Sequence, residues 1–180
     1  MKYYLVALFD DSSSSSLIES QKIVSKRYRL YKNTQVLHIP LGVINTNDFD
    51  KLDSLLSKIF NPYKKFKTVV DNNITFNEDF NSIGFRVEDK GYINKIIRNI
   101  FDTLTLNGIN IKPFNGSILN IPMANANHSV RKASNNSPLS INPKLSKDEI
   151  YCTGKIASFQ IWKQPTSNKE IIKSYALKDY

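Results

Sequence analysis

One short segment of this 180-residue chain occurs twice, and both copies have the composition of a β-strand. Val36-Leu37-His38-Ile39-Pro40-Leu41 reappears 82 residues later as Ile118-Leu119-Asn120-Ile121-Pro122-Met123, and five of the six positions are identical or similar. The exception is His38, which is matched by Asn120. Each copy is accompanied by a long amphipathic helix and a pair of strands, which favours an internal duplication. We therefore predict one domain made of two related halves, about 1–88 and 89–180.

Side-chain alternation assigns a role to each face of these two strands. The apolar positions point to the core: Leu37, Ile39, Leu41, Leu119, Ile121 and Met123. The other face is small or polar and suits a groove: His38, Pro40, Gly42, Asn120, Pro122 and Ala124. Proline is poorly tolerated in a central strand, so its presence in both copies indicates that both strands border an opening. We expect His38 and Asn120 to face each other across a cleft. The alternative is that His38 is a half-buried imidazole bonded to a backbone carbonyl.

The rest of the chain mixes strands and helices. Strands are expected at Lys2–Phe9, Gln35–Ile44, Phe66–Val70, Ile83–Val87, Ile118–Ala124, Tyr151–Lys163 and Glu170–Leu177, the last two as an antiparallel pair. Apolar residues at helical spacing predict a helix over Thr46–Phe60 and another from Ile93 to Leu104. Because strand pairs also follow one another directly, we predict an α+β fold with two pseudo-symmetric lobes. Each lobe is expected to be an antiparallel sheet with flanking helices, and the cleft lies between them.

Two polar segments interrupt this pattern. The serine run Ser12–Ser16 is expected to be a loop that ends in a helix N-cap at Ser16, with Glu19 completing a capping box. Asn125–Lys147 has few apolar residues and contains two prolines, so we expect a long mobile loop.

Composition narrows the class of protein. A single cysteine, Cys152, excludes an internal disulfide and a cysteine-rich metal site, and no metal or cofactor is expected. The start of the chain reads as a strand rather than a signal peptide, and no apolar run approaches membrane-spanning length, so we expect a cytoplasmic protein and no membrane partner. The net charge of +9 suggests a polyanionic partner. A solvated face is favoured over a phosphate-binding one for the two densest basic clusters, which are Lys22, Lys26, Arg27, Arg29 and Lys32, and Lys64, Lys65 and Lys67.

The chain resembles the two-histidine (2H) phosphoesterase superfamily, the 2′-5′ RNA ligase-like (LigT-like) proteins, over nearly its whole length. Tyr3 to Leu8 is similar to the family's first strand, and the two repeated segments fall where its two His-x-Thr/Ser strands belong. Ala157 to Trp162 and Ile171 to Leu177 are similar to its closing strands. In that family the two histidines act as general acid and base on a phosphodiester or cyclic phosphate, and the two hydroxyls hold phosphate oxygens.

This sequence departs from the family motif at three of its four positions. His38 takes the first histidine position, but Asn120 takes the second, and Pro40 and Pro122 take the two hydroxyl positions. Asparagine exchanges no proton near pH 7, and proline has neither a hydroxyl nor an N–H. The resemblance therefore implies a degenerate member that binds a nucleotide or RNA end with little or no turnover. His38 would still donate a hydrogen bond to phosphate.

Two alternatives stay open at this point. One is a residual cyclic phosphodiesterase in which His38 works with a substitute partner. His128, with Arg131 and Lys132 close behind it, would supply that partner from the polar loop, whereas Cys152 is a weak nucleophile candidate. The other is a catalytically inert protein-interaction module that keeps only the fold.

Overall fold

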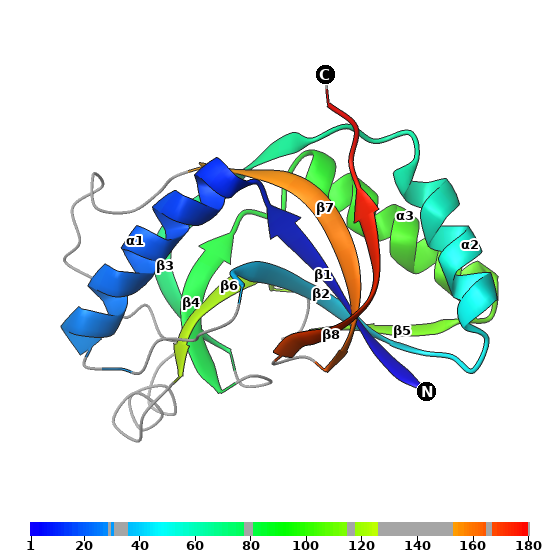
Figure 1. The fold of residues 1–180 in the computed structure, drawn as a ribbon, viewed down its shortest axis with the longest axis horizontal. Coiled ribbons are helices and arrows are strands. Elements are labelled where there is room, and N and C mark those ends of the chain that lie inside the picture. The colour runs from blue at the N-terminus through cyan, green and yellow to red at the C-terminus, as the bar shows by residue number, and fades with distance from the viewer. Residues whose placement is uncertain are drawn as a thin grey trace.

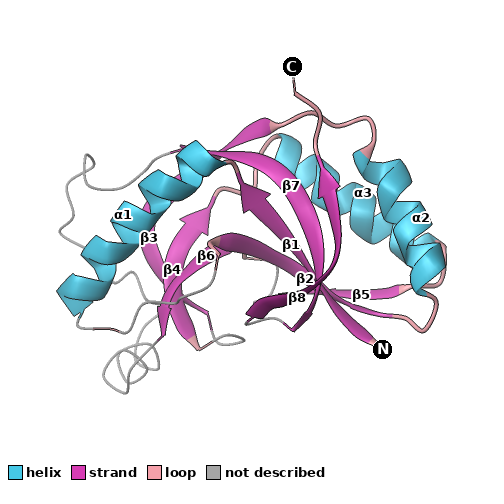
Figure 2. Cartoon of the chain, viewed as in Figure 1, coloured by secondary structure: helices cyan, strands magenta, loops and turns pink. Residues whose placement is uncertain are grey.

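The structure is a computed structural model, and it describes residues 1–28, 30, 36–77, 81–114, 118–125, 153–164 and 167–179. It is an α+β fold, as predicted, in which three helices pack on one large antiparallel sheet (Figures 1 and 2). The elements follow in the order β1 (Lys2–Phe9), α1 (Asp11–Tyr28), β2 (His38–Asn45), α2 (Phe49–Phe60), β3 (Phe66–Asn77), β4 (Ser82–Val87), α3 (Tyr92–Leu106), β5 (Asn110–Pro113), β6 (Asn120–Asn125), β7 (Thr153–Gln164) and β8 (Ser167–Ala176).

The eight strands pair in the order β5-β2-β1-β7-β3-β4-β6, and β8 adds to β7 beside this path. All pairs between these strands are antiparallel. β7 is the branch point, because β1 lies along one of its edges while β3 and β8 share the other. Although β2 and β6 lie near opposite ends of the strand order, they contact each other near the centre of the molecule (Figure 1). The sheet is therefore curved, so that the two strands that contain the repeated segment contact each other.

Two amphipathic helices, α2 and α3, pack on the part of the sheet that contains β5 and β8. The apolar stripes in the sequence predicted both helices. Their buried residues are Leu52, Leu56, Ile59 and Phe60 of α2 and Ile93, Ile96, Ile100 and Leu104 of α3. α2 begins after Asp48, whose side chain accepts a hydrogen bond from the Lys51 amide at 2.9 Å. The two helices lie against each other, and α2 contacts β8 while α3 contacts β5 (Figure 1). Figure 1 shows α1 on the other side of the molecule, where it contacts β6 and β7.

The expected loop at the serine run is wrong, because α1 already begins at Asp11. The Asp10 side chain accepts a hydrogen bond from the Ser13 amide at 2.8 Å, so Asp10 caps the helix six residues before the predicted position. Ser15, Ser16 and Ser20 donate hydrogen bonds to carbonyls four residues earlier. These internal bonds satisfy the hydroxyls within the helix, so the serines do not have to lie in a loop.

The largest differences from the predicted strands are at β3 and β5. β3 continues past the predicted end at Val70 to Asn77, and its register with β4 shifts between Val70 and Ile74. The polar residues after Val70 are therefore an irregularity within a strand, and β5 is a further short strand that the sequence did not suggest. Among the described residues no helix is long and apolar enough to cross a membrane.

The two predicted halves do not separate in space. β1 of the first half pairs with β7 of the second, and β4 of the first half pairs with β6 of the second. The division at about residue 88 and the pseudo-symmetry of two lobes stay predictions.

Candidate functional site

The register of β2 decides which of its side chains share a face. Pro40 lies opposite Val6 and His38 opposite Leu8, but Gly42 lies opposite Leu5, so Leu41 is an extra residue in a β-bulge. His38 and Pro40 share one face, as expected. Gly42 turns to the other face, where an added Cβ would lie 3.3 Å from the Phe101 ring of α3. Simple alternation was therefore wrong for Gly42.

β6 carries the same irregularity at the matching position. Pro122 lies opposite Gly84 and Asn120 opposite Arg86, whereas Ala124 lies opposite Ile83, which leaves Met123 as the extra residue. Leu41 and Met123 are the last residues of the two copies of the repeated segment. Each bulge directly follows a proline, which has no N–H to give to the ladder. This shared backbone feature supports the predicted duplication independently of the side-chain match. It also shows that simple alternation was wrong for Ala124, which lies on the face opposite to Pro122.

The His38 imidazole is buried against an aromatic ring. Its side chain is 2 % exposed, and its ring centroid lies 4.5 Å from that of Trp162, which is fully buried on β7. Nδ1 lies 2.8 Å from the Val36 carbonyl oxygen. Burial lowers the pKa of His38 to about 4, against the opposing effect of this hydrogen bond. The ring is therefore neutral at pH 7, and a carbonyl partner requires the proton on Nδ1.

This arrangement matches the structural alternative for His38, except that the ring is almost fully rather than half buried. Nδ1–H is already bonded, so Nε2 carries only a lone pair and accepts. The expected hydrogen bond from His38 to a phosphate oxygen is therefore not available from the neutral ring.

Asn120 lies on a strand face made of small and polar residues. Its side chain is 1 % exposed, and its Oδ1 accepts a hydrogen bond from Asn77 Nδ2 at 3.1 Å. Its own Nδ2 is buried with no hydrogen-bond partner among the residues that the structure describes. The Ser82 hydroxyl is also buried without a hydrogen-bond partner among the described residues. A buried donor without an acceptor costs about 1–3 kcal/mol, so this face has unused hydrogen-bonding capacity.

A cationic side chain, Arg86, lies next to the unpartnered amide of Asn120. Arg86 is directly opposite Asn120 in the antiparallel ladder, so both side chains leave the sheet on the same face. Arg86 is exposed, whereas Asn120 is buried. The pair therefore combines a solvent-accessible guanidinium with a buried amide donor, and both are suited to an oxyanion.

Asn77, Ser82 and Arg86 were not identified by sequence reasoning. Their relation to Asn120 depends on the pairing of β4 with β6, which connects residues far apart in the chain. The available signal was the polar spacing of Ser82, Gly84 and Arg86 along β4, whose alternate residues Ile83, Phe85 and Val87 are apolar.

Several predicted residues lie outside the described part of the chain. His128, Arg131, Lys132 and Cys152 all fall within 126–152, as does almost all of the expected loop Asn125–Lys147, so their suggested roles stay predictions. Arg29 and Lys32 of the first basic cluster are also not described. Within the described ranges, no three His, Cys, Asp or Glu side chains gather as a metal site would require.

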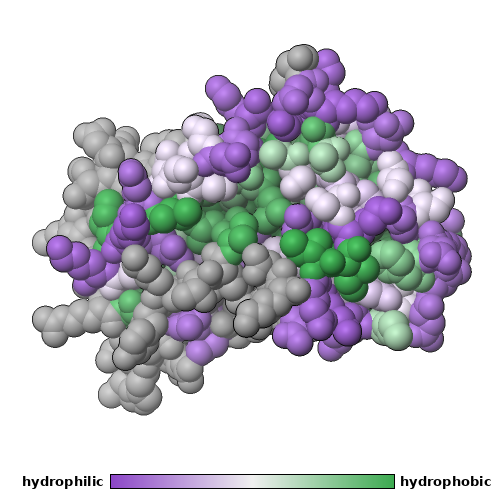
Figure 3. Space-filling view, viewed as in Figure 1, coloured by the Kyte–Doolittle hydropathy of each residue, from purple (hydrophilic) through white to green (hydrophobic). Residues whose placement is uncertain are grey.

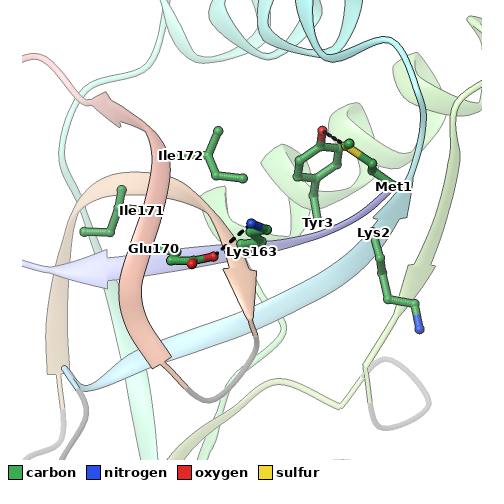
Figure 4. Close-up of a pocket in the computed structure, with 7 residues that line it drawn as sticks. All are labelled: Met1, Lys2, Tyr3, Lys163, Glu170, Ile171 and Ile172. Carbon is green, nitrogen blue, oxygen red and sulfur yellow. Dashed lines mark hydrogen bonds and ion pairs between the residues drawn. The ribbon is translucent and has the colours of Figure 1, made fainter.

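A separate cavity lies away from the motif strands. It has a volume of about 570 Å³ and opens between the start of β1 and the start of β8, with the lining residues Met1, Lys2, Tyr3, Lys163, Glu170, Ile171 and Ile172 (Figure 4). Lys163 and Glu170 form an ion pair at 3.3 Å within it. Figure 3 shows apolar side chains gathered where β8 crosses the start of β1, and Ile171 and Ile172 are 48 % and 36 % exposed. None of the predicted site residues lines this cavity.

Comparisons with known proteins give a match by structure only. The sequence matches no family model and no curated protein. Among solved structures, the chain is similar to a phosphoesterase, at 12 % identity and a TM-score of 0.59, with 99 % of each chain covered. It is also similar to LigT of E. coli complexed with NADP+, at 10 % identity and a TM-score of 0.58, covering 99 % of this chain and 98 % of LigT. Usb1 of Kluyveromyces marxianus matches at 10 % identity and a TM-score of 0.57, with 98 % of each chain covered. The chain therefore has the LigT-like fold that the two-histidine phosphoesterases share.

Proposed function

We propose that this protein binds the phosphate-bearing end of a nucleotide or RNA between β2 and β6, with little or no hydrolysis of the phosphodiester. The observation that carries the proposal is the buried, unpartnered Nδ2 of Asn120 beside the exposed guanidinium of Arg86. Both groups donate hydrogen bonds, and a phosphate oxygen accepts them.

Weak turnover follows from the groups at the four motif positions. Opening a cyclic phosphate requires one group that removes a proton from water and another that protonates the leaving oxygen. Asn120 can do neither near pH 7, and His38 has a pKa of about 4 and a side chain that is 2 % exposed. Pro40 and Pro122 offer no hydroxyl to hold the phosphate. Loss of a single acid–base partner typically lowers a rate by about 10²–10⁴.

Binding has independent support from charge and fold. The net charge of +9 favours an anionic ligand. LigT has been solved with NADP+, ATP and 3′-AMP, and Usb1 with uridine monophosphate, so two proteins of this fold hold nucleotides. Because Asn120 is 1 % exposed, the ligand must displace whatever covers the amide, while Arg86 is accessible from the start. We expect the phosphate to meet Arg86 first and Asn120 after local rearrangement.

The test is a turnover assay run beside a binding titration. The probe is a short oligoribonucleotide that ends in a 2′,3′-cyclic phosphate, and the same oligonucleotide with a free 3′-hydroxyl serves as its control. We expect no cleavage and tighter binding of the cyclic-phosphate end, weakening as salt rises because counterions compete for the phosphate contact.

Two matched variants separate a specific site from general charge. Arg86→Ala should remove the preference for the phosphate end and lower the salt dependence by about one phosphate contact. Arg98→Ala removes the same charge from an exposed position on α3 and should preserve the preference. Equal binding of both oligonucleotides by the wild-type protein would refute the proposed function.

The inert interaction module is the second candidate, and one observation favours it. All four motif positions are buried, which is the state expected of a cleft that no longer admits a ligand. Absence of any oligonucleotide binding at low salt would support this candidate. Robust turnover abolished by His38→Ala would instead support the residual phosphodiesterase, with His128 as the first partner to examine.

A further inference from the structure

The Asn120 amide is held in one orientation by a neighbour that the family motif does not include. Asn77, at the end of β3, is fully buried, and its Nδ2 donates to Asn120 Oδ1 at 3.1 Å. An amide bonded through its oxygen must turn its nitrogen the other way. Asn120 therefore presents Nδ2, and only Nδ2, away from Asn77.

The strand register places this contact on the proposed binding face. Asn77 lies opposite Ser82, and Asn120 lies opposite Arg86, with Gly84 between Ser82 and Arg86 on the same face of β4. Ser82 Oγ is buried and unpartnered, as is Asn120 Nδ2. Gly84 admits no side chain, because an added Cβ would lie 2.8 Å from the Ile121 carbonyl carbon. Gly84 therefore leaves the centre of this face flat, and the unpartnered atoms Ser82 Oγ and Asn120 Nδ2 lie on either side of that centre.

We infer that Asn77 is a positioning residue that fixes Asn120 as a hydrogen-bond donor, so that this face selects a ligand through an acceptor oxygen, with Ser82 Oγ as its second contact. This inference rests on the proposed function and specifies it. An amide free to rotate would offer either its oxygen or its nitrogen, and would accept donors and acceptors alike. The fixed amide discriminates in favour of oxyanions such as a phosphodiester.

A carboxyl group at position 77 tests this polarity directly. In Asn77→Asp the new side chain has nearly the same shape. It donates to Asn120 Oδ1 when protonated, but when ionised it only accepts and turns the Asn120 amide round. Burial raises the pKa of such a carboxyl, which brings its ionisation toward the neutral range.

The expected result is a new pH dependence of binding. Between pH 5.5 and 9, the affinity of Asn77→Asp for the cyclic-phosphate oligonucleotide should fall at least about 10-fold, while that of the wild type stays nearly constant. The phosphodiester does not titrate in this window, and His38 stays neutral because burial lowers its pKa to about 4. Asn125→Asp is the matched control: it adds the same charge at an exposed position on β6, the strand of Asn120, where the carboxyl is ionised throughout. It should show no new pH dependence.

A second readout uses the wild-type protein and does not depend on the folding of a variant. The side-chain amide signals of ¹⁵N-labelled asparagine are followed by NMR during the titration, and the Asn120 pair is assigned by its loss in Asn120→Asp. We expect this pair to shift on binding. Wild-type binding with an unmoved Asn120 signal, or a flat pH profile for folded Asn77→Asp, would overturn the inference and leave the proposed function standing. If the wild-type protein does not bind the phosphate end at all, both fall.

Discussion

Lowering the pH should destabilise this protein through His38. The folded-state pKa of about 4 lies below the ordinary value of 6.5 because the ring is buried beside Trp162. Between these two values the unfolded chain binds the proton and the folded chain does not. The free energy of unfolding contributed by this residue is therefore fully present above about pH 6.5 and is lost as the pH falls toward 4. At pH 4.5 the loss from His38 alone is about 2.5 kcal/mol.

Urea unfolding of wild-type protein and of His38→Gln, each at pH 7 and pH 4.5, isolates this contribution. Glutamine does not titrate, so the drop in unfolding free energy between the two pH values should be smaller in His38→Gln by about 2.5 kcal/mol. Burial raises the pKa values of Asp10 and Asp53, but hydrogen bonds and nearby lysines outweigh it and hold both pKa values below the usual range, so both residues also lose stabilisation at low pH. Their contribution is common to both proteins and cancels in the comparison. Equal pH dependence in the two proteins would refute the reading of His38 as a buried neutral ring.

Three further predictions concern the sheet and the motif positions. Gly84→Ala should destabilise the fold by about 3 kcal/mol or more, measured by urea unfolding, because the added Cβ meets the rigid Ile121 backbone. Gly91→Ala is its control: the added Cβ meets no atom within 4 Å, and the change should cost only about 1 kcal/mol of backbone strain from the φ of 66°. Tyr175→Phe should lower stability at pH 7 by about 1.5–3 kcal/mol, since the hydroxyl donates to Asp53 Oδ1 at 2.8 Å and links β8 to α2; an unchanged melting temperature would contradict this. Asn120→His combined with Pro122→Thr restores half of the paired motif and should raise any trace of cyclic phosphodiesterase activity, whereas a misaligned motif would leave it unchanged.

Local patterns predicted the elements whose signals are local. Hydrophobic periodicity predicted α2 and α3, and strand composition with turn residues predicted β1, β7 and β8; each of these signals needs only nearby residues. The same reasoning failed at Gly42 and Ala124, because a bulge after Pro40 and Pro122 breaks strict alternation. A hydrophobic pattern depends on side chains alone, whereas the missing N–H of proline changes the hydrogen bonding of the backbone ladder.

Sequence reasoning identified two strands of the candidate site but not the partners of Asn120. The repeated segment identified β2 and β6 as the two strands to compare, and they do contact each other. The partners that give Asn120 its chemistry come from β3 and β4, and only the long-range pairing of β4 with β6 makes them neighbours. The same pairing explains why Arg86 was not distinguished from the other basic residues of a chain with a net charge of +9.

We propose that this protein holds a phosphate-bearing RNA end without opening it. The most direct measurement mixes the protein, in excess, with a trace of oligoribonucleotide ending in a 2′,3′-cyclic phosphate, recovers the protein-bound RNA after long incubation, and analyses its end. We predict that the RNA is recovered bound and that its cyclic phosphate is intact. Recovery of an opened phosphate, or no bound RNA at low salt, would contradict the proposed function.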